Sequence, residues 1–295
     1  MSEHAIGLDL GGTQIKAVVV SDGGEILRRE ARPTGGETAP GRPWAQTMRS
    51  LAAELGPALP VGISAPGLAS RDRRSIAFLP QRLPGLEGLD WTAWLARDRP
   101  VPVTNDAHAS LLGEAWIGAA RGLTNVALFT LGTGVGGAAM CDGHLLRGHV
   151  GRAGHLGHLS LDIHGTSSIC RTPGALEDFI GNHNIRERTG GRFSTTHALV
   201  AAFRTGDPDA REAWLKSIRA LACAITSTIN VLDPEAIVIG GGIALAGDAL
   251  FAPLAAELDG IEWRPGGHAV KIFPAALGEW AGAIGAAREA FLANP

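Results

Sequence analysis

Two glycine-rich loops carry residues that could hold the phosphates of a nucleotide. The first, Asp-Leu-Gly-Gly-Thr at residues 9 to 13, lies between the apolar runs 5–8 and 15–20. A glycine turn between two strand-like segments brings backbone N–H groups close to an anion with no side chain in the way. One such loop also fits a plain hairpin, which needs glycines as well. A second loop, Leu-Gly-Thr-Gly-Val-Gly-Gly at 131–137, again follows an apolar run. The pair predicts two lobes that grip one polyphosphate.

A carboxylate, Asp106, stands where an apolar run ends and a helix-like stretch, 109–120, begins. Asn105 and Asp106 both fit the N-cap of that helix. A carboxylate at a strand end beside a helix start is also well placed to take a proton from a hydroxyl group, so capping and general-base chemistry are compatible. Further along, glycines at 240–242 follow a buried strand, where they allow a flat ring or a backbone to approach closely.

The elements that must position these residues alternate between strands and helices, which predicts the α/β class. The longest predicted helix carries an apolar stripe, which indicates packing in a core. Strand-like runs lie at 5–10, 15–20, 60–64, 126–131, 135–140 and 236–240. Helix-like runs lie at 44–55, 109–120, 197–203 and 210–231.

Composition limits the classes of function. The 295 residues suffice for two domains, each with its own core. A net charge of -3 and a sequence pI near 6.4 give no basic surface for nucleic acid. No apolar run reaches the roughly 20 residues that span a bilayer, and no signal peptide is recognisable. Three cysteines are a sparse, odd set that suits a reducing compartment, so we expect a cytoplasmic protein.

The order of motifs resembles the ROK family of sugar kinases and sugar-sensing regulators, within the hexokinase, Hsp70 and actin superfamily. The resemblance implies a two-lobed actin-like ATPase fold of the ribonuclease H-like type, with the active site in the interlobe cleft. The first lobe would span 1–118 with a returning C-terminal helix at 277–295, and the second 119–276. The resemblance runs from Ile6 to about Ala287 and rests on GLDLGGT at 7–13, GISAPG at 62–67, NDA at 105–107, LGTGVGG at 131–137 and IGGG at 239–242.

The resemblance implies an ATP-dependent, Mg²⁺-requiring hexose kinase. Asp9 would organise Mg²⁺ through water, and Asp106 would be the general base that activates a sugar hydroxyl, normally the 6-hydroxyl of glucose or a related hexose or N-acetylhexosamine. The other nucleotide-binding residues would be Gly11, Gly12, Thr13, Gly132, Thr133, Gly134, Gly240, Gly241 and Gly242. The sugar-binding residues would be Gly67, Asn105, Asp106, His155, His158 and Glu177, with Gln81 or Arg82 from a loop.

The chain departs from the family pattern at a structural zinc site. Of four expected ligands only His158 and Cys170 are present, because Ser168 and Ala175 stand where the family has two thiolates. Structural zinc sites are closed four-ligand sets, so we expect this remnant to be metal-free. An alternative is a rebuilt site with other ligands drawn from the clustered histidines His144, His149, His155, His158 and His164.

His155 also replaces a sugar-contacting glutamate of the family. A carboxylate accepts hydrogen bonds from two adjacent hydroxyls, whereas a neutral imidazole offers one donor and one acceptor, so sugar preference should change. Some sugar-sensing regulators carry His here, so the rival function is a sensor that binds hexose without phosphate transfer. Against it, Asp106 is retained, and the phosphate motif begins at Ile6, which leaves no room for a helix-turn-helix domain.

A third function, an ATPase-like chaperone or cytoskeletal protein, lacks support from any substrate domain or filament-type insertion. We therefore expect a small-molecule sugar as the partner, with neither nucleic acid nor membrane. Family members are often homodimers, and the sequence leaves the oligomeric state open.

Overall fold

The chain forms two compact units, each built on one five-stranded sheet. The computed structural model describes residues 3–36, 41–80 and 82–294. Unit 1 comprises Met1–Gly122, Leu145–Ala153 and Ala276–Pro295. Unit 2 comprises Leu123–His144 and Gly154–Ala275.

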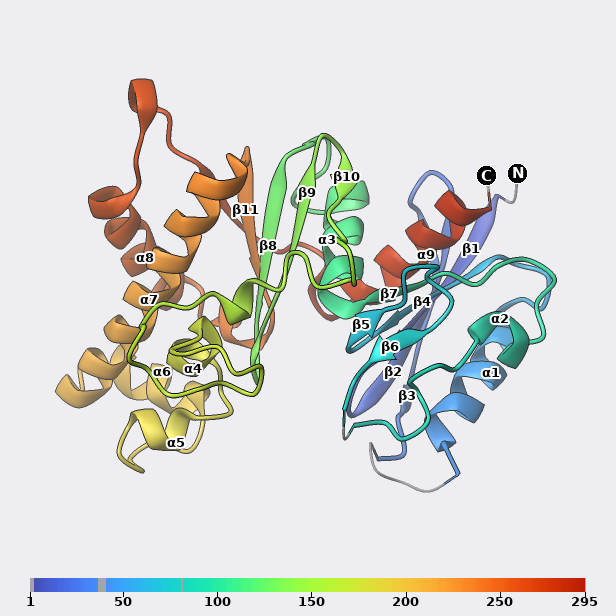
Figure 1. Cartoon of the computed structure of the whole chain (residues 1–295), viewed down its shortest axis with the longest axis horizontal. Coiled ribbons are helices and arrows are strands. Elements are labelled where there is room, and N and C mark those ends of the chain that lie inside the picture. Colours follow the sequence, from blue (N-terminus) through green and yellow to red (C-terminus); the bar gives the residue numbers. More distant parts are fainter. Residues whose placement is uncertain (1–2, 37–40, 81, 295) are drawn as a thin grey trace. The chain divides into compact units, whose positions relative to one another are not determined.

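The two sheets follow the same plan (Figure 1). The strand order is β3-β2-β1-β4-β7 in the first and β10-β9-β8-β11-β12 in the second. In each, an antiparallel hairpin (β1–β2 or β8–β9) leads to a run of parallel strands. The first sheet contains β1 (His4–Leu10), β2 (Gln14–Ser21), β3 (Ile26–Pro33), β4 (Val61–Ala65) and β7 (Val103–Asn105). The second contains β8 (Val126–Leu131), β9 (Val135–Cys141), β10 (His144–Leu145), β11 (Ala236–Gly240) and β12 (Lys271–Pro274). A small sheet pairs β5 (Leu68–Ala69) with β6 (Ile76–Phe78).

Several helices begin at a residue whose side chain caps them. Asn105, Thr195 and Asp207 each accept a backbone N–H at the start of a helix. In unit 1 the helices are α1 (Pro43–Leu55), α2 (Trp91–Trp94), α3 (Asp106–Ile117) and α9 (Ala281–Ala293), with a 3-10 turn at Gly278–Trp280. In unit 2 they are α4 (Leu176–Ile180), α5 (Ile185–Arg188), α6 (Thr196–Arg204), α7 (Pro208–Leu232) and α8 (Asp248–Ile261), with 3-10 turns at Leu156–His158, Gly242–Ala246 and Pro265–Gly267.

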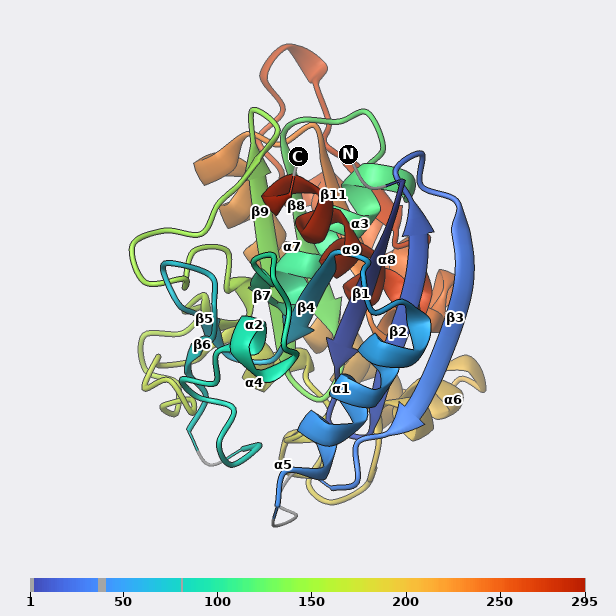
Figure 2. The same cartoon turned by 90° about the vertical axis from the view of Figure 1, so that its right-hand side faces the viewer.

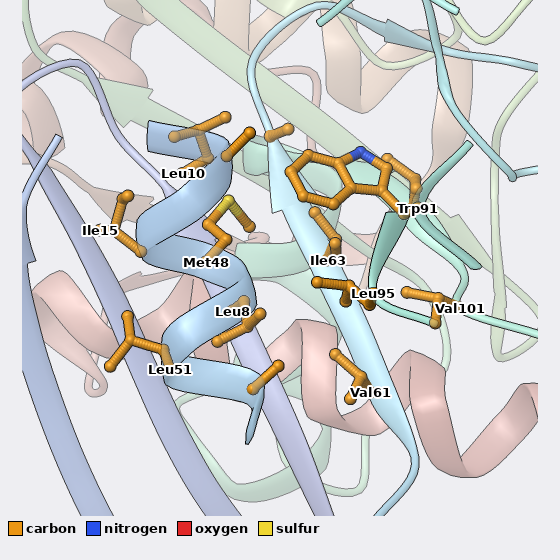
Figure 3. Packing of buried hydrophobic residues seen from close by; sticks show 14 of the residues in the cluster. Leu8, Leu10, Ile15, Met48, Leu51, Val61, Ile63, Trp91, Leu95 and Val101 are labelled. Atoms are coloured by element: carbon orange, nitrogen blue, oxygen red, sulfur yellow. The ribbon is translucent and has the colours of Figure 1, made fainter. Parts of the chain in front are cut away.

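Alternation along the strands divides unit 1 into two cores. Leu8 and Leu10 of β1 and Ile63 of β4 face α1, where Met48 is fully buried among them (Figure 3). In Figure 2, α1 lies in front of β1 and β2. The intervening positions of β1 face α9 on the other side of the sheet, where Ala5 joins a second apolar cluster. Because Asp9 shares the parity of Ala5, the fold directs its carboxylate toward α9.

Helix α9 packs on the sheet and on α3 through glycines that bring backbones together. A Cβ at Gly7 would lie 1.8 Å from the Ala283 carbonyl oxygen, and a Cβ at Gly285 would lie 1.7 Å from that of Ala109. Only a residue without a side chain fits at such a contact. The small residues of α9 therefore allow this helix to pack closely against the sheet and α3.

We expect Gly285→Ala in α9 to destabilise the protein by about 1–3 kcal/mol or more, the usual cost of overpacking. The matched control is Gly260→Ala in α8, where nothing lies within 4 Å of an added Cβ. There, alanine should be neutral or stabilising by about 0.5–1 kcal/mol. Urea unfolding of both variants checks the pair, and equal effects would contradict this packing.

A buried carboxylate holds the segments at which the chain leaves and re-enters unit 1. Glu114, on α3, is fully buried. Its carboxylate accepts the backbone N–H groups of Ala119 at 2.7 Å, Ala276 at 3.1 Å and Leu277 at 2.9 Å. Three donors compensate for the burial of the charge.

The elements predicted from apolar periodicity are present, with two kinds of difference. Helix α3 begins three residues before the predicted 109, because Asn105 caps it. Several elements were not predicted, among them strands β3, β7 and β12 and helix α8: β3 is a largely exposed edge strand rich in charged residues, and α8 contains Pro253. Helix α7 has the length and composition to cross a membrane, but half of its most apolar window is buried inside the structure. That burial is typical of a core helix.

Candidate active site

In unit 1, polar side chains gather at one edge of the sheet. Strands β1, β4 and β7 run parallel, and Asp9 pairs in register with Ser64. Asp9, Ser64 and Asn105 each lie at or next to the carboxyl end of their strand, and Asp106 follows directly. The carboxyl ends of parallel strands meet at the same edge, which is where open α/β sheets bind ligands.

Asp9 is held in a protein environment that resists its charge. The Ser64 hydroxyl donates a hydrogen bond of 2.6 Å to Oδ1 of Asp9, and a Cβ at Gly282 in the first turn of α9 would lie 2.8 Å from its Cγ. Burial raises the pKa of Asp9 from 3.8 to about 6. The Ser64 hydrogen bond and the charge of Lys16 oppose this rise, and the negative charge of Asp106 adds to it. The two carboxylates are therefore close enough to interact electrostatically.

Asn105 and Asp106 divide the roles that the sequence left open. The Asn105 side chain caps α3 by accepting the N–H groups of Ala107 and His108. Its amide also donates a hydrogen bond of 3.0 Å to the Gly67 carbonyl oxygen, and a second amide hydrogen is available to a ligand. Asp106 is then the first residue of the helix and is exposed. The helix dipole favours a negative charge there.

The first glycine loop closes the β1–β2 hairpin at the same edge. The Gly11 N–H donates to the Gln14 carbonyl oxygen at 3.0 Å. Thr34, which directly follows β3, stabilises the turn with two hydrogen bonds. Its hydroxyl donates to the Gly11 carbonyl at 2.8 Å and its N–H donates to the Thr13 carbonyl at 3.0 Å. Gly12 and Thr13 form the tip, and Thr13 is exposed. The carbonyl groups of Gly11 and Thr13 therefore point toward Thr34 and into the protein.

In unit 2, the second glycine loop closes the β8–β9 hairpin in the equivalent position. The Gly132 N–H donates to the Gly134 carbonyl at 3.0 Å, and Leu131 pairs with Val135 across the hairpin. Thr133 at the tip is exposed, and nothing lies within 4 Å of a Cβ added at Gly132. The side of Gly132 on which a Cβ would stand is therefore open.

The triple glycine at the end of β11 packs against this hairpin. Gly241 has a φ of 85°, and a Cβ there would lie 2.3 Å from the Leu131 carbonyl oxygen. A Cβ at Gly240 would touch Ala275 at 3.0 Å, whereas Gly242 faces open space. The structure therefore brings the predicted adenosine loop next to the predicted phosphate loop, as one nucleotide would require.

The predicted sugar-binding residues of unit 2 form a small cluster. The rings of His155 and His158 stack, with centroids 6.4 Å apart. Nδ1 of His158 lies 3.4 Å from Oε1 of Glu177, and this carboxylate raises the pKa of His158. Burial raises the pKa of Glu177, but His158 and the charge of His183 outweigh burial, so the net shift is downward. Glu177 also adjoins the second glycine loop, because a Cβ at Gly134 would lie 2.7 Å from its Oε2.

The donor set does not fit a structural zinc ion. Sγ of Cys170 lies 3.4 Å from Nε2 of His158. At the two positions where the family has thiolates, the Ser168 hydroxyl accepts backbone N–H groups in a turn, and Ala175, whose side chain is a methyl group, occupies the N-cap position of α4. Among the residues that the structure describes, no three His, Cys, Asp or Glu side chains are grouped to hold a metal.

We expect elemental analysis of protein purified without a His-tag to find zinc far below one ion per chain. Two donors do not close a tetrahedral site, so any ion would exchange readily. Addition and removal of a chelator should leave the thermal midpoint unchanged. Stoichiometric zinc that survives dialysis would refute the metal-free interpretation.

The predicted site residues thus fall into two groups, one in each unit. Two of them are not placed in either cluster: Arg82 lies in an exposed loop, and Gln81 lies outside the described residues. Sequence reasoning missed Ser64 and Gly282 as neighbours of Asp9, although Ser64 belongs to the GISAPG motif. The unit 1 group is Asp9, Gly11, Gly12, Thr13, Gly67, Asn105 and Asp106. The unit 2 group is Gly132, Thr133, Gly134, His155, His158, Glu177, Gly240, Gly241 and Gly242.

Comparisons with known proteins agree with this architecture. The chain is 35% identical over 272 residues to a glucokinase of Thermotoga maritima, covering 84% of this chain and 85% of the relative. It is 31% identical over 250 residues to an N-acetylmannosamine kinase of Escherichia fergusonii, covering 82% and 84%. A ROK family glucokinase of Streptomyces griseus, solved in complex with glucose and AMPPNP, matches with a TM-score of 0.79 and 28% identity over 98% of this chain and 99% of that one.

These likenesses bear on the fold and the family. The two similar sheets, each with its glycine hairpin, form the two-lobed actin-like ATPase fold that the motifs predict. The sequence model of the family described as "ROK family" matches residues 5–291 of this chain. The chain therefore belongs to the ROK family.

Proposed function

We propose that this chain is an ATP-dependent sugar kinase that transfers the γ-phosphate of ATP to a hexose hydroxyl, with Asp106 as the general base. The observation that carries the proposal is the edge of the unit 1 sheet, where Asp9, Asp106 and the first glycine loop lie together. A phosphoryl-transfer enzyme needs phosphate-binding backbone, a site for Mg²⁺ and a group that accepts the hydroxyl proton. This edge offers candidates for all three.

In this mechanism the chain acts mainly by positioning. The braced turns at Gly11–Thr13 and Gly132–Gly134 present backbone donors to the phosphates, and Asn105 orients the acceptor hydroxyl beside Asp106. Asp106 takes the hydroxyl proton as the oxygen attacks phosphorus and ADP leaves. A carboxylate suffices as the base, because the proton is lost late in a loose transition state.

Asp9 fits the role of organising Mg²⁺ through water. It is a carboxylate at the loop edge, and its negative charge is disfavoured in the protein alone, as its raised pKa records. A cation nearby would relieve that cost. Bound Mg²⁺ would neutralise charge on the β- and γ-phosphates.

The acceptor we propose is glucose or a close relative such as an N-acetylhexosamine, phosphorylated at the 6-hydroxyl. Relatives named for glucose and for N-acetylmannosamine are both similar to this chain. His155 stands in the sugar cluster with His158 and Glu177 and offers a different hydrogen-bonding pattern from a carboxylate. We therefore expect these three side chains to contribute to the choice among hexoses.

The test is a coupled ADP-release assay with Mg-ATP against a panel of hexoses, N-acetylhexosamines and polyols. The sugar with the highest kcat/KM names the acceptor, and phosphorus–proton NMR of the product identifies the phosphorylated oxygen. Turnover with glucose or an N-acetylhexosamine at the 6-position supports the proposal. Phosphorylation of polyols alone, or of another hydroxyl, would contradict it.

A further inference from the structure

One segment of unit 2 holds the carbonyls of the second glycine loop. The segment 181–184 connects α4 to α5. The Asn182 N–H donates to the Gly132 carbonyl at 3.0 Å, and the His183 N–H donates to the Thr133 carbonyl at 2.9 Å. With both carbonyls occupied from one side, the loop has a fixed orientation rather than the freedom of an exposed glycine turn.

The imidazole of His183 adds a link from this loop to α4. Its Nδ1 lies 3.0 Å from the same Thr133 carbonyl oxygen, and its Nε2 lies 3.2 Å from Oδ1 of Asp178. Both partners are hydrogen-bond acceptors, and each lies within hydrogen-bond distance of a different ring nitrogen. Asp178 follows Glu177 in α4, which makes the ring a bridge between the phosphate loop and the helix with the predicted sugar ligand.

The segment is anchored to the core of the unit as well. Arg188 donates to the Gly181 carbonyl at 3.0 Å, to Oδ1 of Asn184 at 3.1 Å and to the Ser217 hydroxyl on α7 at 2.6 Å. One guanidinium thus fixes both ends of the segment to the longest helix. Because the segment 181–184 is held at both ends, we expect a displacement of the glycine loop to displace α4 as well.

We propose that His183 is a positioning residue that couples the nucleotide loop Gly132–Gly134 to Glu177, so that each substrate strengthens binding of the other. The inference rests on the proposed function. Glu177 and the loop also touch directly, since Oε2 of Glu177 would lie 2.7 Å from a Cβ at Gly134. A nucleotide that shifts the position of the loop therefore shifts Glu177 through two contacts, one of which is the imidazole of His183. Reciprocity requires the sugar to strengthen nucleotide binding by the same factor.

The experiment is calorimetric titration of the full chain with glucose, with and without saturating Mg-AMPPNP. For the wild type we expect AMPPNP to lower the Kd of glucose by about 5-fold or more, within the usual range of such couplings. In His183→Ala the factor should fall but stay above one, because the direct contact between Glu177 and the loop remains, while the Kd of each ligand measured alone changes by less than about 3-fold. The backbone N–H bond to Thr133 survives this substitution, so a merely structural role would not move the ratio selectively.

Two further variants secure the result. Asp178→Asn keeps the size of its side chain but weakens the contact with the ring. It should also reduce the coupling, so the inference is tested even if His183→Ala fails to fold. The matched control is His197→Ala, an exposed histidine in α6, which should retain the wild-type factor.

The outcomes separate the inference from the proposed function. Wild-type coupling retained in the His183 and Asp178 variants, or lost equally in the control, overturns the inference alone. A wild type that binds glucose and AMPPNP independently also overturns only the inference. A wild type that binds neither AMPPNP nor any sugar of the panel overturns the proposed function, and the inference falls with it.

Discussion

Asp106→Asn is expected to lower kcat by about 10²–10⁴-fold, the usual contribution of a general base. The amide is nearly the same size as the carboxylate. It retains an oxygen that can accept the Ala107 N–H, which in the wild type donates to Oδ1 of Asp106 at 2.8 Å. It has no basic oxygen to take the hydroxyl proton. Steady-state ADP release at saturating sugar measures kcat, and calorimetric titration with Mg-AMPPNP should give a Kd within about twofold of the wild type, because binding does not need the base.

The matched control is Asp98→Asn, which makes the same chemical change at an exposed position. It should leave kcat and nucleotide binding unchanged. Loss of a charge at the start of α3 should cost the Asp106 variant only about 0.3–1 kcal/mol of stability, so it remains folded. Turnover within tenfold of the wild type in Asp106→Asn would remove the general-base assignment.

Asp9→Asn should lower the activity of the protein and raise its stability. We expect kcat/KM for Mg-ATP to fall by about 10²–10³-fold, because an amide organises hydrated Mg²⁺ poorly where charge develops. The same change should stabilise the protein without Mg²⁺ and nucleotide at pH 8. A pKa raised from 3.8 to about 6 means that the ionised carboxylate is disfavoured in the folded state by up to about 3 kcal/mol.

The pH dependence fixes the sign of this effect. Because folding raises the pKa of Asp9, the folded state binds its proton more tightly, and the contribution of Asp9 to stability becomes less unfavourable as the pH falls from about 6 toward 3.8. The advantage of Asp9→Asn should therefore be full above pH 6 and nearly gone by pH 4. Urea unfolding at pH 8 and pH 4 measures it, with Asp98→Asn as the control. An equal gain at both pH values would show that burial of charge is not the cause.

Much of this site could be predicted from the sequence, because the patterns that identify its residues are local. Apolar runs identified the strands of both hairpins, and the glycines between them identified the loops. Asp106 was found in the same way, at the junction of a strand and a helix. The charged edge strand β3 escaped because half-buried strands are recognised by apolar alternation, which Arg28, Arg29 and Arg32 obscure.

Contacts between distant segments could not be predicted. Ser64 reaches Asp9 only because β4 pairs in parallel with β1, across 55 residues of sequence. His183 meets Thr133 because a connection between two short helices folds onto a hairpin 50 residues earlier. In both cases the side chain type fits many roles, and tertiary pairing selects one.

The most direct test of the central claim is coupled ADP release by the wild-type chain with Mg-ATP in the presence and absence of glucose and the other sugars of the panel. The account predicts ADP release that depends on the sugar and a phosphorylated sugar in equal amount. Calorimetric binding of a hexose without any sugar-dependent ADP release would contradict it and would identify the chain as a sugar sensor.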